Sequence, residues 1–157
     1  MLSLRSIDEH NWFGVLALQI KPSQTKFVAS PVNILARAYV YRNNNAQALA
    51  IYNDEKIIGV CLICELNDDL CVYELQQFLI DYRYQGRGFG KDAVKLVISM
   101  LKNKGKYSMA EACVHRDDIV ALNLYKSVGF IDTKLRDRQV PESILLRYYL
   151  KDEEDGS

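Results

Sequence analysis

The chain has 157 residues, 49% of them hydrophobic and 25% charged, which predicts one domain with one sizeable core. Lysine plus arginine (20) equals aspartate plus glutamate (20), so the formal net charge is zero and the balance argues against nucleic-acid binding. Charged residues interrupt the N-terminal segment, and no stretch approaches the roughly 20 apolar residues of a membrane span. We therefore expect a cytoplasmic protein without a membrane partner, with one domain over residues 1–150 and a polar, acidic tail over 151–157.

The first half of the chain predicts a strand, two helices and three further strands. Leu2–Arg5 alternates as a short strand does, and apolar residues then recur at helical spacing over 8–20 and 29–39. Pro22 separates the two helices, and Pro31 suits the first turn of the second. Three strands bounded by polar turns follow, at 46–52, 57–65 and 70–80.

The second half alternates helices and strands. An amphipathic helix follows residue 90 and ends at Gly105, and a second, shorter helix ends at Gly129. Strands are expected at 107–114, 130–135 and 143–150, the last two as a hairpin. The predicted fold is α+β: one mixed, mostly antiparallel sheet with helices on both faces, in the order β-α-α-β-β-β-α-β-α-β-β.

Four cysteines raise the question of a metal or redox site. Cys61 and Cys64 have the C-x-x-C spacing, but they lie in an apolar run that is typical of a strand, where residues three apart point to opposite faces. A second C-x-x-C is missing and the two histidines are far apart in sequence. We interpret these two, together with Cys71 and Cys113, as buried or half-buried small hydrophobic residues, and we expect no metal.

A glycine-rich turn, Gln85–Gly90, lies between a strand and a helix. Glycines let the backbone approach a ligand closely, and a helix N-terminus offers unpaired N–H groups and partial positive charge, so the turn suits a phosphate. For the glycines alone, a tight strand-to-helix turn is an equally good interpretation. A Walker loop fails because Asp92 follows Lys91, and a dinucleotide fingerprint fails because Lys91 stands where its third glycine belongs.

Two motifs together resemble the GNAT family of N-acetyltransferases. Gln85-x-x-Gly-x-Gly90 is similar to the pyrophosphate loop of that family, and Ala121–Phe130 matches its A-x-x-L-Y-x-x-x-G-F motif in the expected order and context. Phe78–Asp81, Arg83–Gly86 and Gln24–Tyr41 resemble more closely the bacterial spermine/spermidine acetyltransferases. The resemblance implies the GNAT fold and transfer of an acetyl group from acetyl-CoA to a small-molecule amine, with a polyamine as the first candidate. The alternatives are an aminoglycoside-like amine, the amine of a peptide or protein, and a non-catalytic CoA-binding regulatory module on the same fold. The resemblance implies a homodimer as well.

The resemblance also implies how acetyl-CoA is bound. The pantetheine arm would add to the backbone of Phe78–Ile80 like an extra strand, and the pyrophosphate would lie on the loop N–H groups. Arg87 and Lys91 would add positive charge, although a solvated surface position explains Lys91 equally well. The cofactor-binding residues expected in this way are Phe78, Leu79, Ile80, Gln85, Gly86, Arg87, Gly88, Phe89, Gly90, Lys91, Asp118 and Tyr125.

Tyr125 matches the family tyrosine that protonates the departing thiolate. A phenol with a pKa of about 10 is neutral at pH 7 and has a proton to give. An aromatic core residue under Gly129 is the alternative. Asp118 departs from the family, which often carries Asn there: it can cap a helix, but when ionised it cannot donate a hydrogen bond to the cofactor.

The general base is less well defined. The polyamine branch carries an acidic residue where this chain has Gln76, which cannot act as a base. Glu74 lies two residues earlier and shares the face of Gln76 on a regular strand, unless a bulge intervenes. Glu111 on the next strand is the other candidate, and an exposed strand position is the alternative for Glu74. Several acidic turns would attract a polycation if they converged near the cleft. Their residues are Glu65, Asp68, Asp69, Glu74, Glu111, Asp117 and Asp118.

Overall fold

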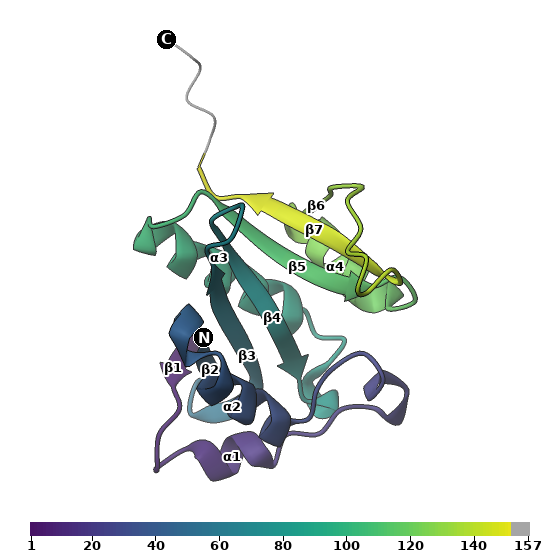
Figure 1. Ribbon diagram of the computed structural model, residues 1–157. Helices are drawn as coiled ribbons and strands as arrows, with labels where there is room; N and C mark the ends of the chain where they lie inside the picture. Colours follow the sequence, from purple (N-terminus) through teal and green to yellow (C-terminus); the bar gives the residue numbers. More distant parts are fainter. Residues whose placement is uncertain (152–157) are drawn as a thin grey trace.

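The computed structural model describes residues 1–151, and residues 152–157 of the predicted tail lie outside the described residues. The element order is the predicted one, with three short 3-10 turns added (Figure 1). The strands are β1 (Leu2–Ser6), β2 (Gln47–Asn53), β3 (Lys56–Leu66), β4 (Val72–Ile80), β5 (Met109–His115), β6 (Ile131–Asp132) and β7 (Ser143–Tyr149). The helices are α1 (Trp12–Leu16), α2 (Pro31–Val40), α3 (Phe89–Lys104) and α4 (Ile119–Val128), and the 3-10 turns are η1 (Pro22–Gln24), η2 (Arg42–Asn44) and η3 (Tyr82–Tyr84).

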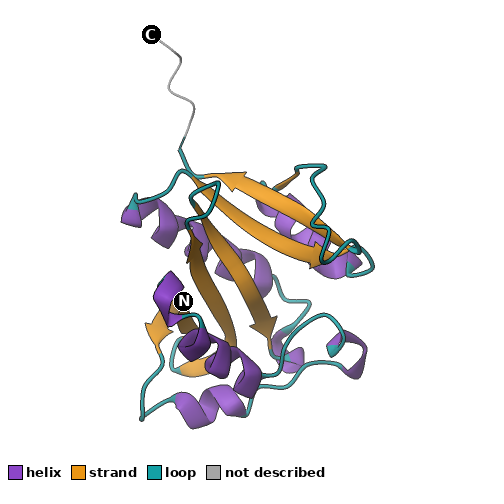
Figure 2. Cartoon of the chain, viewed as in Figure 1, coloured by secondary structure: helices purple, strands orange, loops and turns teal. Residues whose placement is uncertain are grey.

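The strands form one mixed sheet in the order β1-β2-β3-β4-β5-β7-β6. Every neighbouring pair is antiparallel except β4 and β5, which run parallel because α3 crosses between them. Figure 2 shows helices on either side of the strands. The predicted α+β architecture is therefore confirmed.

Alternating residues of the strands build a core on each face of the sheet. On β3, Cys61 and Ile63 belong to the core under α3 and α4, whereas Val60, Leu62 and Cys64 belong to the core under α1 and α2. This is the two-residue period of a strand buried on both faces. Within the described residues, no helix is both long and apolar enough to cross a membrane.

The prediction for the cysteines is right for two of them and wrong for two. Cys61 and Cys64 are buried, and burial raises the pKa of their thiols to about 12 and about 11. Cys71 and Cys113 are exposed, because Cys71 lies in the turn before β4 and Cys113 points to the face of β5 opposite the core under α3 and α4. In the part of the chain that the structure describes, no cluster of metal-binding side chains occurs.

Two elements are shorter than predicted. The helix expected over 8–20 is helical only over Trp12–Leu16, because the N–H of Gln19 donates to the carboxylate of Asp81 (2.9 Å) instead of a helix carbonyl. The strand expected over 130–135 spans only Ile131–Asp132, because Asp132 accepts a hydrogen bond from the N–H of Lys134 (2.8 Å), which turns the chain.

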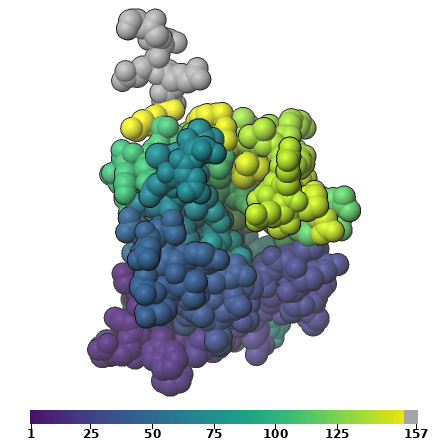
Figure 3. All heavy atoms as spheres, in the orientation of Figure 1, coloured from purple at the N-terminus to yellow at the C-terminus, as the bar shows by residue number. Residues whose placement is uncertain are grey.

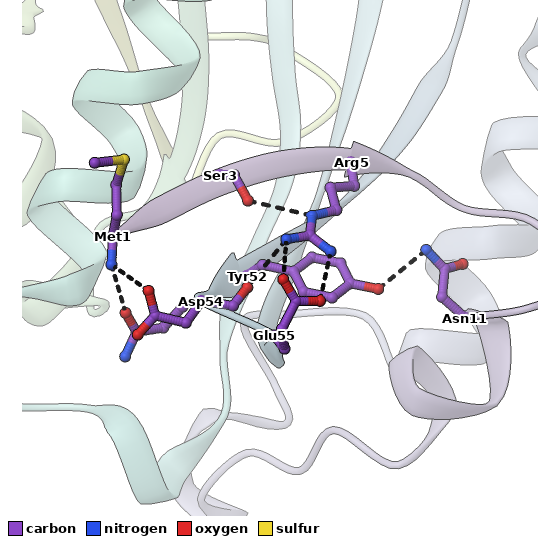
Figure 4. A network of polar contacts seen from close by, with 8 residues as sticks. Met1, Ser3, Arg5, Asn11, Tyr52, Asp54 and Glu55 are labelled. Atoms are coloured by element: carbon purple, nitrogen blue, oxygen red, sulfur yellow. Dashed lines mark hydrogen bonds and ion pairs between the residues drawn. The ribbon is translucent and has the colours of Figure 1, made fainter.

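Arg5 of β1 lies in a cluster of polar contacts at the edge of the sheet (Figure 4). The guanidinium of Arg5 donates to both carboxylate oxygens of Glu55 (3.2 Å each) and lies 4.0 Å above the ring of Tyr52. The Tyr52 hydroxyl accepts from Asn11 (3.3 Å), so the same cluster ties α1 to the sheet edge. Arg5 is thus engaged far from the glycine-rich loop.

Candidate active site

Strands β4 and β5 separate after a short parallel contact. They pair only at Tyr73 with Ala110 and at Glu74 with Glu111, and beyond this point they diverge (Figure 1). Strand β4 continues to pair with β3 as far as Ile80, which lies opposite Gly59. A Cβ at Gly59 would lie 2.4 Å from the carbonyl oxygen of Leu79, so only glycine permits this close approach. The far end of β4 consequently has one paired edge and one edge open toward a cleft.

A bulge in β4 places polar side chains beside the point of divergence. The pairing with β3 jumps from Gln77 to Leu75, so Gln76 has no partner of its own. Gln76 Nε2 donates to Cys64 Sγ (3.8 Å), and Gln77 Oε1 accepts from the N–H of Ala29 (3.0 Å). Both glutamines therefore point toward the α1–α2 side. This is the irregularity that the sequence left open.

The main cleft has a volume of about 400 Å³ and lies between the open edge of β4, the glycine-rich loop and the start of α4. The predicted cofactor residues that line it are Phe78, Leu79, Ile80, Gln85, Gly86, Gly88, Gly90, Lys91 and Asp118. Arg87 and Phe89 do not line it, and Tyr125 lines an adjoining pocket instead.

The glycine-rich loop presents the N-terminus of α3 to this cleft. Gly86 (φ 77°) and Gly88 (φ 84°) have left-handed backbone conformations that favour glycine. The first intrahelical hydrogen bond runs from the N–H of Asp92 to the carbonyl of Gly88 (3.1 Å). The N–H groups of the residues between them precede it and have no intrahelical acceptor, so they can receive an anion.

The side chains of the loop have different tasks from its backbone. The Gln85 amide exchanges hydrogen bonds with Gln24 of η1 (3.0 and 3.1 Å) and donates to the carbonyl of Ile80 (2.7 Å). Phe89 packs edge-on against Tyr84, and Arg87 lies over the same ring. Gln85 and Phe89 therefore hold the loop in place, and only their backbone remains for a ligand.

A buried carboxylate fixes the end of β4 just before the loop. Asp81 is fully buried and accepts from the N–H of Gln19, the N–H of Arg83 and the Arg83 guanidinium, all within 2.9–3.1 Å. Burial alone would raise the pKa of Asp81, but these hydrogen bonds outweigh burial and lower it. Asp81 thus stays ionised and joins the α1–α2 segment to the loop.

Tyr125 lies on the inner face of α4, where it is 5% exposed. Its ring meets Phe78 and Phe130 edge-on, with ring centroids 6.5 and 5.1 Å apart. Burial, and after it the charges of neighbouring acidic groups, raise the pKa of Tyr125, so the phenol keeps its proton at neutral pH. It is packed as a core residue and also lines the adjoining pocket, and its role as an acid stays a prediction.

The adjoining pocket, called here the splay pocket, opens where β4 and β5 separate. Its volume is about 90 Å³, and it shares with the main cleft the residues Val28, Phe78, Asp118, Ala121 and Leu124. The other residues that line it are Phe27, Leu75, Gln76, Gln77, Ala112, Cys113, Val114, His115 and Tyr125.

Two carboxylates meet at the closed end of the splay. Glu111 is bound by Arg147 of β7 (2.7 and 2.9 Å), and both side chains are nearly buried. Glu74 is partly buried, and burial, with help from the charge of Glu111, raises its pKa; the Gln76 amide and Arg37 oppose the rise. The raised pKa makes Glu74 a candidate proton acceptor, although Glu74 is not among the residues that line the splay pocket.

Asp118 begins α4 as its N-cap. Its carboxylate accepts from the N–H of Ala121 (3.2 Å), and the side chain lines both the main cleft and the splay pocket. The capping role foreseen from the sequence is confirmed, while contact with a cofactor stays a prediction.

The acidic residues noted in the sequence do not gather into one cluster. Glu65 binds Lys106 (2.6 Å) and Asn45 (2.9 Å) at the end of β3, and Asp68 and Asp69 lie in the following turn. Asp117 follows β5 beside His115, and Asp118 alone of the set lines the main cleft and the splay pocket. Glu74 and Glu111 face each other at the closed end of the splay.

One wall of the cleft was not predicted as part of the binding site. Ile20, Lys21, Gln24 and Val28, from the segment between α1 and α2, line it opposite α4. The ring of Phe27 lies 5.2 Å from that of His115 at the end of β5, which brings this segment across the splay. In Figure 3, a hollow separates the blue and purple segments from the yellow-green segment before β7. Hydrogen bonds between distant residues hold the segment at the site: Gln19 with Asp81, Gln24 with Gln85 and Ala29 with Gln77.

The family model of the acetyltransferase (GNAT) family matches residues 12–130. The chain belongs to this family. The spermine/spermidine N(1)-acetyltransferase of Bacillus subtilis is 25% identical over 138 residues, covering 82% of this chain and 87% of the relative.

Solved structures show the same fold. An aminoglycoside acetyltransferase in complex with coenzyme A has a TM-score of 0.77 at 13% identity and covers 95% of each chain. A spermidine N-acetyltransferase from Vibrio cholerae, solved with CoA and spermine, has a TM-score of 0.68 at 15% identity and covers 93% of this chain and 92% of its own. As a member of the GNAT family, this chain takes acetyl-CoA as its co-substrate. The homodimer stays a prediction.

Proposed function

We propose that this protein transfers the acetyl group of acetyl-CoA to a primary amine, and that a polyamine is its acceptor. The observation that carries the proposal is the open edge of β4 at Phe78–Ile80, which runs from the glycine-rich loop to the splay pocket beside Tyr125. A polyamine is favoured because the Bacillus subtilis relative acts on spermine and spermidine.

The residues along the cleft divide the work of binding. The N–H groups at the start of α3 would bind the pyrophosphate, with Lys91 adding positive charge and Arg87 acting from outside the cleft wall. The backbone of Phe78–Ile80 would hydrogen-bond the peptide-like arm as an added strand. Asp118 would act through the start of α4, which it caps.

Two side chains would handle protons during the transfer. An aliphatic amine with a pKa of about 10.4 is roughly 99.9% protonated at pH 7, and only its neutral form attacks the thioester. Glu74, with its raised pKa, would take that proton through a water molecule. Tyr125, which stays protonated, would give its proton to the sulfur as the thiolate leaves.

The experiment that tests this function measures thiol release from acetyl-CoA. The acceptor panel is spermidine, spermine, kanamycin and a peptide with a free N-terminus and one lysine, and the thermal shift caused by acetyl-CoA is recorded beside it. Saturable turnover highest with spermidine or spermine supports the proposal. Turnover only with kanamycin or the peptide would overturn the polyamine acceptor. A thermal shift without turnover on any amine would favour a non-catalytic CoA-binding module on the same fold.

A further inference from the structure

Gln76 has a buried oxygen without a partner. Among the described residues, Gln76 Oε1 is the one buried side-chain polar atom that makes no hydrogen bond. The other end of the same amide is engaged, because Nε2 donates to Cys64 Sγ (3.8 Å) and lies beside the Glu74 carboxylate, which requires a donor. These neighbours fix the orientation of the amide, so the unpaired atom is the acceptor oxygen.

The next residue shows that the bulge does not force this arrangement. Gln77 points to the same side of β4, and its Oε1 accepts from the N–H of Ala29 (3.0 Å). The bulge therefore carries two glutamines: the amide oxygen of Gln77 accepts a hydrogen bond from the protein, and that of Gln76 does not. A buried acceptor without a donor destabilises a fold, and its persistence is explained where a ligand supplies the donor.

The position of Gln76 indicates which ligand this is. Gln76 lines the splay pocket together with Phe78 and Tyr125, at the end of the open edge of β4. This is where the acceptor nitrogen must stand to reach a thioester held along that edge. An amide oxygen accepts a hydrogen bond from an N–H group but takes up no proton at neutral pH.

We propose that Gln76 Oε1 accepts a hydrogen bond from an N–H of the acceptor amine and so holds the nitrogen in the splay pocket. The inference rests on the proposed function and extends it: Gln76 binds the acceptor, and Glu74 remains the base. A primary amine suits this contact, because its neutral form still carries two N–H groups after the ammonium proton has left, and the amide product still carries one. Since Gln76 is uncharged, the acceptor is recognised through its N–H at this point and not through its charge.

The test compares Gln76→Met with Gln77→Met, a matched pair that removes the same amide from neighbouring positions. Thiol release is measured with whichever amine of the panel the wild-type protein acetylates best, and melting temperature is recorded for each variant. For Gln76→Met we expect the KM for the amine to rise about tenfold, with an unchanged KM for acetyl-CoA and a slightly lower melting temperature, because Glu74 and Cys64 lose the Gln76 amide donor. For Gln77→Met we expect a lower melting temperature, because the N–H of Ala29 loses its acceptor.

Two other results would overturn the inference. A Gln76→Met variant with an unchanged KM for the amine, in a protein whose wild type turns over, would remove this role and leave the proposed function standing. Absence of turnover by the wild type with every amine would remove the proposed function and this inference with it. If the methionine variant folds poorly, the measurement is repeated with Gln76→Leu, which also removes the amide but has a branched side chain.

Discussion

Glu74 and Glu111 stand opposite each other at the last paired position of β4 and β5. One of them is neutralised, because Arg147 binds Glu111 at 2.7 Å. The other has no cation of its own within salt-bridge distance among the described residues, and its pKa is raised. The splay of the two strands thus begins at a pair of carboxylates that are chemically unequal.

The first prediction concerns the pH dependence of catalysis. The negative charge of Glu111 contributes to the raised pKa of Glu74, so Glu111→Gln lowers that pKa. A base with a lower pKa is deprotonated at lower pH. The acid limb of the profile of kcat/KM for the amine should therefore move to lower pH, as measured by thiol release across a pH series.

Two controls accompany this variant. Glu55→Gln removes an exposed carboxylate that lines neither the main cleft nor the splay pocket, and it should leave the profile in place. Glu111→Gln leaves Arg147 nearly buried without its partner, which costs stability, so the double variant Glu111→Gln/Arg147→Gln serves if the single one unfolds. A Glu111→Gln profile that superimposes on the wild-type profile would exclude Glu74 as the titrating base.

The second prediction concerns Tyr125→Phe. The hydroxyl makes no hydrogen bond to another described residue, so the substitution should leave the melting temperature close to that of the wild type. Loss of the proton donor should lower kcat by about 100-fold or more, with little change in the dissociation constant of acetyl-CoA. Thiol release and calorimetric titration measure the two quantities. Equal losses in binding and rate would instead assign Tyr125 a packing role.

The third prediction concerns the charge at the start of α3. Lys91 is exposed in the first turn of this helix and lines the main cleft. Lys91→Ala should weaken acetyl-CoA binding by roughly three- to tenfold at low salt, and by less at high salt, since ions screen an exposed charge. Lys95→Ala, one turn further along, is the matched control and should bind as the wild type does. Loss of affinity that does not change with salt would contradict a charge contact with phosphate.

Most of the fold followed from local patterns that the structure retains. The two-residue alternation of β3 and the glycine that ends α3 are visible in the sequence, and Gly105 has the left-handed conformation (φ 66°) that such an ending requires. The loop from Gln85 to Gly90 was found because its spacing and context are local. The side-chain contacts of the loop were not predicted, because Gln85 hydrogen-bonds to Gln24, which is 61 residues away in the sequence.

The remaining features of the site depend on pairing between distant residues. The bulge at Gln76 exists only in the register of β4 against β3, and the Glu111–Arg147 pair requires β7 to lie beside β5. Cys113 belongs to an apolar strand by its neighbours, yet it is exposed because its side chain points away from the core under α3 and α4. None of these contacts has a local signature, and so the sequence left the base and the acceptor pocket open.

The fourth prediction concerns Asp81, where hydrogen-bond donors from Gln19 and Arg83 converge on a buried carboxylate. In Asp81→Asn one oxygen becomes an NH₂ group that faces these donors, and the ion pair is lost. We expect a loss of about 3 kcal/mol in the free energy of unfolding, or roughly 6–12 °C in melting temperature. Thermal unfolding of the wild type and the variant at pH 7 measures this loss of stability. Acetyl-CoA should also bind more weakly, because Asp81 holds the strand end that leads into the loop.

Acid should reduce the difference in melting temperature between the wild type and Asp81→Asn. The folded pKa of Asp81 lies below the unfolded value of about 3.9, so its stabilisation is complete above that value and is lost as the pH falls through the folded pKa. The wild type should therefore lose more melting temperature than Asp81→Asn on acidification below about pH 4. Glu55→Gln, which removes the exposed partner of Arg5, is the control and should melt nearly as the wild type does. If the gap between wild type and Asp81→Asn stays constant down to the lowest pH at which both fold, the carboxylate charge of Asp81 is not what holds this junction.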